Sequence, residues 1–113
     1  DTPCLVLTDG ARVLGFASYS QFRGGDGYRF SVEHTINLHS DAHGTGAGRD
    51  LLDALSKLAK DAGKHTMYAG VCAENQGAVD FHVKVGFTIV AVLPEVGHKF
   101  GRWLDLVLMQ KRL

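Results

Sequence analysis

The sequence predicts a mixed α/β domain in which a mostly antiparallel, twisted sheet is flanked by helices. Short apolar runs bounded by turn residues alternate with two segments of helical periodicity. The chain has 113 residues, of which 45% are hydrophobic and 21% charged, a balance typical of one folded domain. No repeat, low-complexity tract or Pro-rich linker divides it. We therefore expect residues 1–113 to form a single domain.

Composition excludes several classes of protein. Twelve Lys and Arg residues balance twelve Asp and Glu residues, which argues against a general nucleic-acid binder. No apolar run approaches the roughly 18 residues of a membrane span. Residues 1–4 do not begin a signal peptide pattern, so we expect a cytoplasmic protein. Cys4 and Cys72 are too few for a disulfide framework, and the spacing of His34, His39 and His43 is not that of a zinc site. We expect no metal.

Three strands are expected in the first third of the chain. Residues 4–7 and 12–19 form a hairpin around the turn residues 8–10, and a glycine-containing loop at 21–27 leads into a long strand at 28–38. Alternation places the following residues of that strand on one face: Phe30, Val32, His34, Ile36 and Leu38. Glu33 and its alternate neighbours Arg29, Ser31, Thr35 and Asn37 lie on the other face.

Two helices and three further strands complete the predicted order β-β-β-α-β-α-β-β. Apolar residues recur at helical spacing after Gly48, and Gly63 is suited to end that helix. Asn75 can cap the second helix, which Gly86 ends. The remaining strands are expected at 66–72, 87–93 and 103–109, with a loop at 94–102. A parallel strand pair is expected where a helix separates two strands.

A glycine-rich junction precedes the first helix. Gly44, Gly46 and Gly48 allow positive φ and close approach of a ligand, and a helix N-terminus attracts phosphate. Arg49 opposes the positive end of the helix dipole, so an anion there would offset it. The spacing matches neither a Walker A loop nor a dinucleotide fingerprint. The residues alone leave open a loop that merely turns tightly.

Four segments in order resemble the GNAT N-acetyltransferases, in particular the phosphinothricin and methionine sulfoximine acetyltransferase branch. They are the strand at 28–34, the H-G-T-G-A-G loop at 43–48, the segment from Asn75 to Phe87, and the G-H-K-F-G-R-W-L-D segment at 97–105. The resemblance covers almost the whole chain and implies acetyl transfer from acetyl-CoA to an amine. Members of the family begin with a further strand and two helices, so we expect the chain to be incomplete at its N-terminus.

The resemblance implies a set of residues that bind acetyl-CoA. Backbone groups of the strand end would bind the pantetheine arm, the glycine-rich loop would bind the pyrophosphate, and Asn75 would contact the arm. The set is Ile36, Asn37, Leu38, His43, Gly44, Thr45, Gly46, Ala47, Gly48, Arg49 and Asn75. His43 stands where the family usually has Arg or Gln. Lys84 is either a further phosphate contact or a solvated helix lysine.

Two residues are candidates for acid–base chemistry. An ammonium must lose a proton before it attacks a thioester, and Glu33 matches the family's glutamate for that step. From the residues alone, a solvated strand carboxylate in a salt bridge is the favoured interpretation of Glu33, and the resemblance reverses this preference. His82 occupies the position from which relatives protonate the departing thiolate; a packed helix histidine is the alternative, with solvent as the acid.

Acceptor recognition is expected from the loop before the third strand, at Phe22, Arg23 and Tyr28. Arg23 could pair with an acceptor carboxylate, or with nothing. The expected acceptor is a small amino-acid-like amine of the phosphinothricin or methionine sulfoximine type. Alternatives are a polyamine or antibiotic acceptor, and an acyl-CoA-binding module without turnover. The resemblance also implies a possible homodimer.

Overall fold

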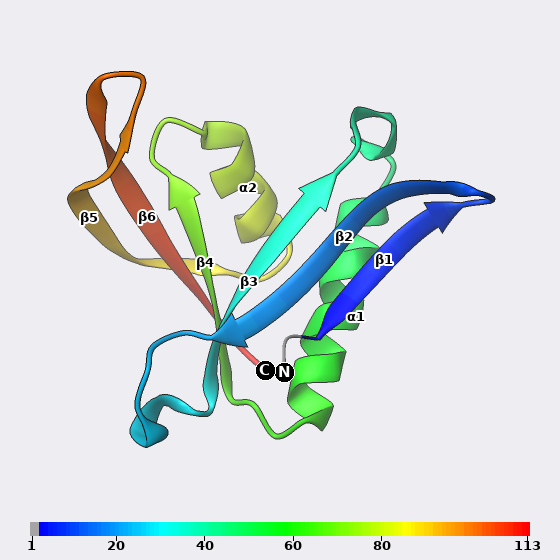
Figure 1. The fold of residues 1–113 in the computed structure, drawn as a ribbon, viewed down its shortest axis with the longest axis horizontal. Coiled ribbons are helices and arrows are strands. Elements are labelled where there is room, and N and C mark those ends of the chain that lie inside the picture. The colour runs from blue at the N-terminus through cyan, green and yellow to red at the C-terminus, as the bar shows by residue number, and fades with distance from the viewer. Residues whose placement is uncertain (1–2) are drawn as a thin grey trace.

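The computed structural model describes residues 3–113 as one six-stranded sheet with two helices (Figure 1). The strands are β1 (Cys4–Asp9), β2 (Arg12–Gln21), β3 (Ser31–Leu38), β4 (Thr66–Cys72), β5 (Thr88–Lys99) and β6 (Arg102–Arg112). The helices are α1 (Ala47–Asp61) and α2 (Gln76–Lys84), and short 3₁₀ turns cover Asp26–Tyr28 and Ser40–Ala42. The predicted fold class and order of strands and helices are confirmed. No helix among the described residues is both long enough and apolar enough to cross a membrane.

The strands lie in the order β1-β2-β3-β4-β6-β5. Every neighbouring pair is antiparallel except β3 and β4, which α1 connects as a parallel pair, as the sequence predicted. Helix α2 connects β4 to β5, but β6 lies between those two strands. The β5–β6 hairpin therefore forms one edge of the open sheet.

The parallel pair is short, and this opens the sheet. Pairing between β3 and β4 covers only Ser31–Thr66, Val32–Met67 and Glu33–Tyr68. Beyond Glu33 the two strands diverge, and each keeps pairing only with its antiparallel neighbour (Figure 1). The backbone edge of β3 that faces β4 is therefore unpaired from residue 34 onward.

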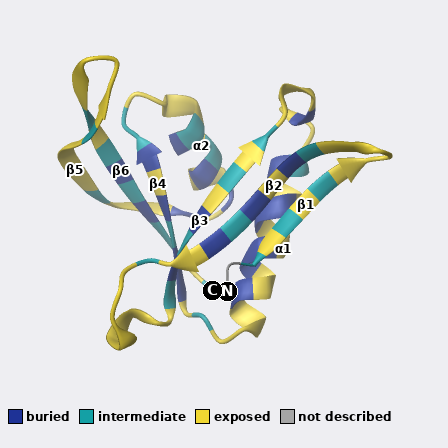
Figure 2. Ribbon diagram, viewed as in Figure 1, coloured by how far each residue is buried: buried dark blue, intermediate teal, exposed yellow. Residues whose placement is uncertain are grey.

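The core lies between the sheet and α1. Buried residues alternate along β2, β3, β4 and β6, as expected of strands covered on one face (Figure 2). Leu52, Leu55 and Ala59 of α1 are fully buried against this face, together with Met67 and Met109. At roughly 1.5–3 kcal/mol per buried large apolar side chain, this packing holds both sides of the opening in place.

The third strand begins three residues later than predicted. Residues 26–28 form a 3₁₀ turn instead, so Tyr28, Arg29 and Phe30 do not continue the alternation of β3. Gly25, at φ 107°, turns the chain, and the Arg29 guanidinium hydrogen-bonds the Asp26 carbonyl and stacks on Phe30. These local contacts outweigh the extended preference of an aromatic run.

The predicted loop at 94–102 is wrong, because β5 continues to Lys99. A β-bulge between Leu93 and Gly97 absorbs Pro94, which an edge strand tolerates. The backbone N–H of Glu95 is satisfied by the Asp105 carboxylate at 2.9 Å. Phe100 and Gly101, both at positive φ, then form the tight turn into β6.

Candidate functional site

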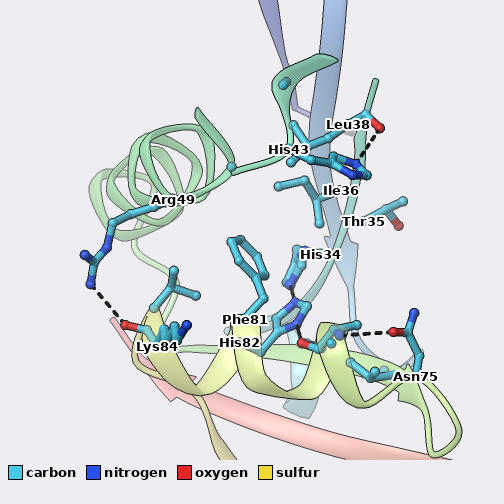
Figure 3. Close-up of a pocket in the computed structure, with 18 of the residues that line it drawn as sticks. His34, Thr35, Ile36, Leu38, His43, Arg49, Asn75, Phe81, His82 and Lys84 are labelled. Carbon is cyan, nitrogen blue, oxygen red and sulfur yellow. Dashed lines mark hydrogen bonds between the residues drawn. The ribbon is translucent and has the colours of Figure 1, made fainter. Parts of the chain in front are cut away.

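A cavity of about 1070 Å³ occupies the opening between β3 and β4. One wall is β3 with the loop and first turn of α1, and the other is α2 (Figure 3). Helix N-termini, glycines and aromatic side chains line it, whereas a smaller hollow lies at the far end of α1. The opened sheet therefore holds a cavity beside the glycine-rich junction.

The wall formed by the β3–α1 junction presents backbone. Gly44 and Gly46 have φ of 75° and 84°, conformations that L side chains rarely adopt, and a Cβ at either would meet nothing within 4 Å. No side chain caps α1 at Gly46. A fifteen-residue helix thus directs its free N–H groups and the positive end of its dipole at the cavity.

Gly48 has a different role, because it lets α1 approach its neighbours. A Cβ at this position would lie 2.8 Å from Leu38 Cδ1 and 3.3 Å from the Phe81 ring. The first turn of α1 therefore packs directly against β3 and α2. This explains why a glycine is needed in helical conformation, where it otherwise destabilises by about 1 kcal/mol.

The polar side chains of this wall are bonded within the protein. The Thr45 hydroxyl donates to the Ala42 carbonyl at 2.6 Å and accepts from the Ala47 N–H at 3.2 Å. His43 Nε2 lies 3.3 Å from the Leu38 carbonyl. Thr45 and Ala47 could therefore contact a ligand only through their backbone groups. The Ala47 N–H is already bonded to the Thr45 hydroxyl.

Arg49 reaches across the cavity mouth. Its Nη2 donates to the Lys84 carbonyl at 3.0 Å, at the C-terminus of α2. This contact offsets part of the unfavourable position of a cation at the start of α1. The guanidinium has further N–H groups with which to bind an anion.

The α2 wall presents bonded side chains. Asn75 Oδ1 accepts from the Ala78 N–H at 3.0 Å and so caps α2, as predicted. Phe81 and Ala78 line the cavity beside it. At this second strand-to-helix junction, a side chain occupies the place that a ligand could take at the first.

His82 lies in this wall, and both of its ring nitrogens have partners. Nδ1 is 2.7 Å from the Ala78 carbonyl, and Nε2 is 3.0 Å from Nε2 of His34 on β3 (Figure 3). The two imidazoles stack with centroids 5.1 Å apart, and both pack on Phe87. Burial, and then the neighbouring imidazole, lower the pKa of His34 to about 4; burial also lowers the pKa of His82. Both rings are therefore neutral at pH 7.

Glu33 lies at the point where the strands separate. It is the last residue of β3 paired with β4, opposite Tyr68, and its side chain is on the face away from Val32 and His34. One carboxylate oxygen lies 3.1 Å from the position of a Cβ on Gly70. Burial raises the pKa of Glu33 above its ordinary value. No salt bridge involves Glu33 among residues 3–113, so it is not the paired surface carboxylate that the sequence left possible.

The three predicted acceptor residues lie near the start of β3, but only one contacts a strand beside Glu33. Phe22 stacks on Tyr68 with centroids 4.4 Å apart. Arg23 instead lies over the ring of Tyr28, at 4.9 Å. The structure thus places Phe22 near the Glu33 carboxylate, while Arg23 and Tyr28 form a separate pair on the loop.

Sequence reasoning missed four residues of this region. Tyr68 and Gly70 come from β4, Phe81 comes from α2, and His34 was considered only as a strand residue and as a metal ligand. Strand register, which places Tyr68 opposite Glu33 and Gly70 two residues further on, was the signal that could have found the first two. Nothing local in the sequence pairs His34 with His82, which is 48 positions away.

The part of the chain that the structure describes contains no group of three or more His, Cys, Asp or Glu residues arranged to hold a metal ion. Cys72 is a free thiol, half-buried in the cavity wall. The cavity therefore offers backbone donors, one carboxylate and neutral imidazoles for binding and catalysis.

A sheet opened between parallel strands, with an uncapped helix aimed into the opening, is a geometry suited to a phosphate-bearing ligand. The sequence model of the acetyltransferase (GNAT) domain matches residues 5–108. The chain belongs to that family.

Individual relatives agree with this placement. The L-amino acid N-acyltransferase MnaT of Escherichia coli is 46% identical over 98% of the chain, and the L-methionine sulfoximine/L-methionine sulfone acetyltransferase of Salmonella typhimurium is 44% identical over 98%. The structure of yncA from Salmonella typhimurium, solved with its cofactor acetyl-CoA, superimposes with a TM-score of 0.93 at 44% identity over 99% of the chain. The chain spans 64–65% of the length of these three proteins.

Proposed function

We propose that this domain transfers an acetyl group from acetyl-CoA to the primary amine of a small amino-acid-like acceptor, of the methionine sulfoximine or phosphinothricin type. The observation that carries the proposal is the uncapped, glycine-lined N-terminus of α1 beside the unpaired edge of β3, with Glu33 at the point of divergence. The names of the relatives support the acceptor class.

The residues present fit acetyl-CoA. Gly44 and Gly46 leave open space where side chains would stand, and N–H groups of residues 44–49 other than that of Ala47, together with the Arg49 guanidinium, would hold the pyrophosphate. The edge of β3 that faces away from β2, at Ile36, Asn37 and Leu38, would hold the pantetheine arm, with Asn75 opposite. Bound there, acetyl-CoA supplies the acetyl group as an activated thioester.

Glu33 would serve as the base. The acceptor ammonium gives one proton to the carboxylate, directly or through water, and the freed amine attacks the thioester carbonyl carbon. The C–N bond forms, the C–S bond breaks, the nitrogen loses its second proton, and the thiolate takes up one proton. The net reaction yields the amide, CoA thiol and one proton. The raised pKa of Glu33 brings it nearer to that of a useful base.

The proton for the thiolate would come from solvent or from His82, and the hydrogen bonds favour solvent. His82 is neutral, donates Nδ1–H to Ala78, and has Nε2 opposite His34. We place His82 in the wall beside the arm, with Phe81. Phe22, with Tyr68, would contact the acceptor near Glu33, and the exposed Arg23–Tyr28 pair would meet its carboxylate from the loop.

A thiol-release assay with acetyl-CoA over a panel of amines tests the proposal. We expect CoA release with methionine sulfoximine or phosphinothricin above release with polyamines or aminoglycosides. Glu33→Gln should lower turnover about 10²–10⁴-fold and leave acetyl-CoA affinity unchanged, whereas Glu95→Gln, on the β5 bulge, should change neither. Acetyl-CoA binding without release for any amine would instead identify a binding module.

Location and assembly are further proposals. We propose a cytoplasmic homodimer that forms through the β5–β6 hairpin, where Val92, Val96, Phe100 and Trp103 are exposed. Light scattering of the chain and of Trp103→Glu measures the oligomeric state directly, and we expect the variant to be monomeric. A wild-type chain that is monomeric at high concentration would refute it.

A further inference from the structure

His34 and His82 form a contact that the proposed reaction does not use. The pair joins β3 to α2 in the cavity lining, with Nε2 to Nε2 at 3.0 Å and side chains of both residues buried (Figure 3). Two imidazole nitrogens at this distance must share one proton, because two bare lone pairs would repel. The question is which nitrogen carries it.

The Ala78 carbonyl settles the question. A carbonyl only accepts, so His82 Nδ1, at 2.7 Å, carries a proton. In the neutral ring the Nε2 atom of His82 is then a bare acceptor, so His34 donates its Nε2–H to it. His34 Nδ1 is left without a proton, and it is a buried side-chain nitrogen with no hydrogen-bond partner in the described structure. His34 thus donates a hydrogen bond to His82, and His82 donates one to the Ala78 carbonyl.

We propose that His34 is a positioning residue for His82. The Nε2–H of His34 occupies the only free lone pair of His82, and this bond holds the His82 ring neutral and fixed in the wall of the cavity. This inference rests on the proposed function, because it assigns the ring a place beside the acetyl-CoA arm. The contacts that carry it are observed independently of that function.

Protonation of the pair would break this arrangement. A proton added to His82 Nε2 removes the acceptor of the His34 donor, and a proton added to His34 Nδ1 is buried without a partner. The other ionisable groups lining the cavity are Glu33, His43, Arg49, Cys72 and Lys84. None of them hydrogen-bonds either imidazole among residues 3–113, so no carboxylate stabilises an added proton. The surrounding rings of Phe81 and Phe87 are apolar.

Two substitutions separate positioning from filling space. His34→Gln keeps a side-chain N–H donor, whereas His34→Leu keeps bulk and removes the donor. We expect His34→Leu to raise the pKa of His82 above its wild-type value, because the bond that favours the neutral ring is gone, although burial still lowers it; His34→Gln should leave the pKa unchanged. His65→Gln, at an exposed histidine, is the control and should have no effect on His82.

Titration of the His82 ring by ¹⁵N NMR measures this without acceptor or turnover, so a failure of the proposed function would not obscure it. We expect a protonated Nδ1 and a hydrogen-bonded, bare Nε2 at pH 7. In activity, His34→Leu should lower turnover about tenfold, the order of one lost hydrogen bond, and His34→Gln should restore it. In a His82→Phe background His34→Leu should then have less than about a twofold effect. An unchanged His82 titration in His34→Leu, or additive effects in the double variant, would overturn the proposal.

Discussion

The two walls of the cavity present different chemistry, although each begins at a junction from strand to helix. The β3–α1 wall is glycine backbone with no side-chain cap on the helix, while the α2 wall has a capping Asn75 and a histidine whose nitrogens are both bonded. A helix end that the protein satisfies itself has a structural role, whereas one left open is available to a ligand. Under the proposed function, the α1 side would bind the pyrophosphate, while the α2 side would supply shape and the Asn75 contact with the pantetheine arm.

The largest expected effect is a loss of stability in acid, which comes from the histidine pair of the α2 wall. The pKa of His34 is about 4 in the folded chain and near 6.5 when unfolded, so the unfolded chain binds more protons between these values. The contribution of His34 to the free energy of unfolding should therefore be fully present above pH 6.5. It should be lost as the pH is lowered towards 4, and the total loss is on the order of 3 kcal/mol. Urea unfolding at pH 7 and 5 measures it. His34→Gln should lack this part of the loss; identical losses in both proteins would remove the histidine pair from the explanation.

A second test breaks the α1 wall while holding backbone strain constant. Gly46 and Gly63 both have φ of 84° and open space at the Cβ position, but only Gly46 faces the cavity. Each substitution to Ala should destabilise the fold by about 1–2 kcal/mol. Only Gly46→Ala should also weaken acetyl-CoA binding, by roughly tenfold, which calorimetry would record. Equal affinities in the two variants would contradict the assignment of this wall to the ligand.

Asn75 tests whether the α2 junction serves structure alone. Asn75→Ala removes the cap and should cost about 1 kcal/mol of stability, measured by thermal unfolding. Asn75→Ser keeps a capping oxygen and should recover most of that loss. Because we place Asn75 against the pantetheine arm, we expect acetyl-CoA affinity to remain reduced in the serine variant; full recovery of affinity would limit the role of Asn75 to the cap.

The smallest effect is expected at the outer end of the same junction. Glu74 makes a two-pronged ion pair with Arg102, at 2.6 and 2.8 Å, joining the start of α2 to the β5–β6 hairpin. Both side chains are more than half exposed and the pair is screened by solvent, so Glu74→Gln should leave the midpoint of chemical denaturation almost unchanged. A large loss of stability would mean that the hairpin is essential to the α2 wall.

The sequence predicted those parts of the molecule that depend on local chemistry. Glycines at 63 and 86 end their helices at positive φ, and Asn75 caps α2, because these signals act within one helical turn. The glycine-rich junction that lines the cavity is likewise a local signal in the sequence. These features needed no knowledge of distant contacts.

Long-range pairing explains what the sequence could not predict. Pro94 and Gly97 read as loop residues, but pairing with β6 and the Asp105 carboxylate hold them in a bulged strand. Likewise, Tyr68 lies opposite Glu33 only through the register of β3 on β4, and His34 meets His82 only once α2 has packed. Contacts between segments far apart in the chain decide these positions.

The assignment of the two walls is tested most directly by titrating the ¹⁵N-labelled chain with acetyl-CoA and following the backbone amide signals. We predict saturable shifts that are largest at residues 36–38 and 44–49, with smaller shifts along α2. Shifts confined to α2 or to the β5–β6 hairpin, or no binding at all, would contradict the account.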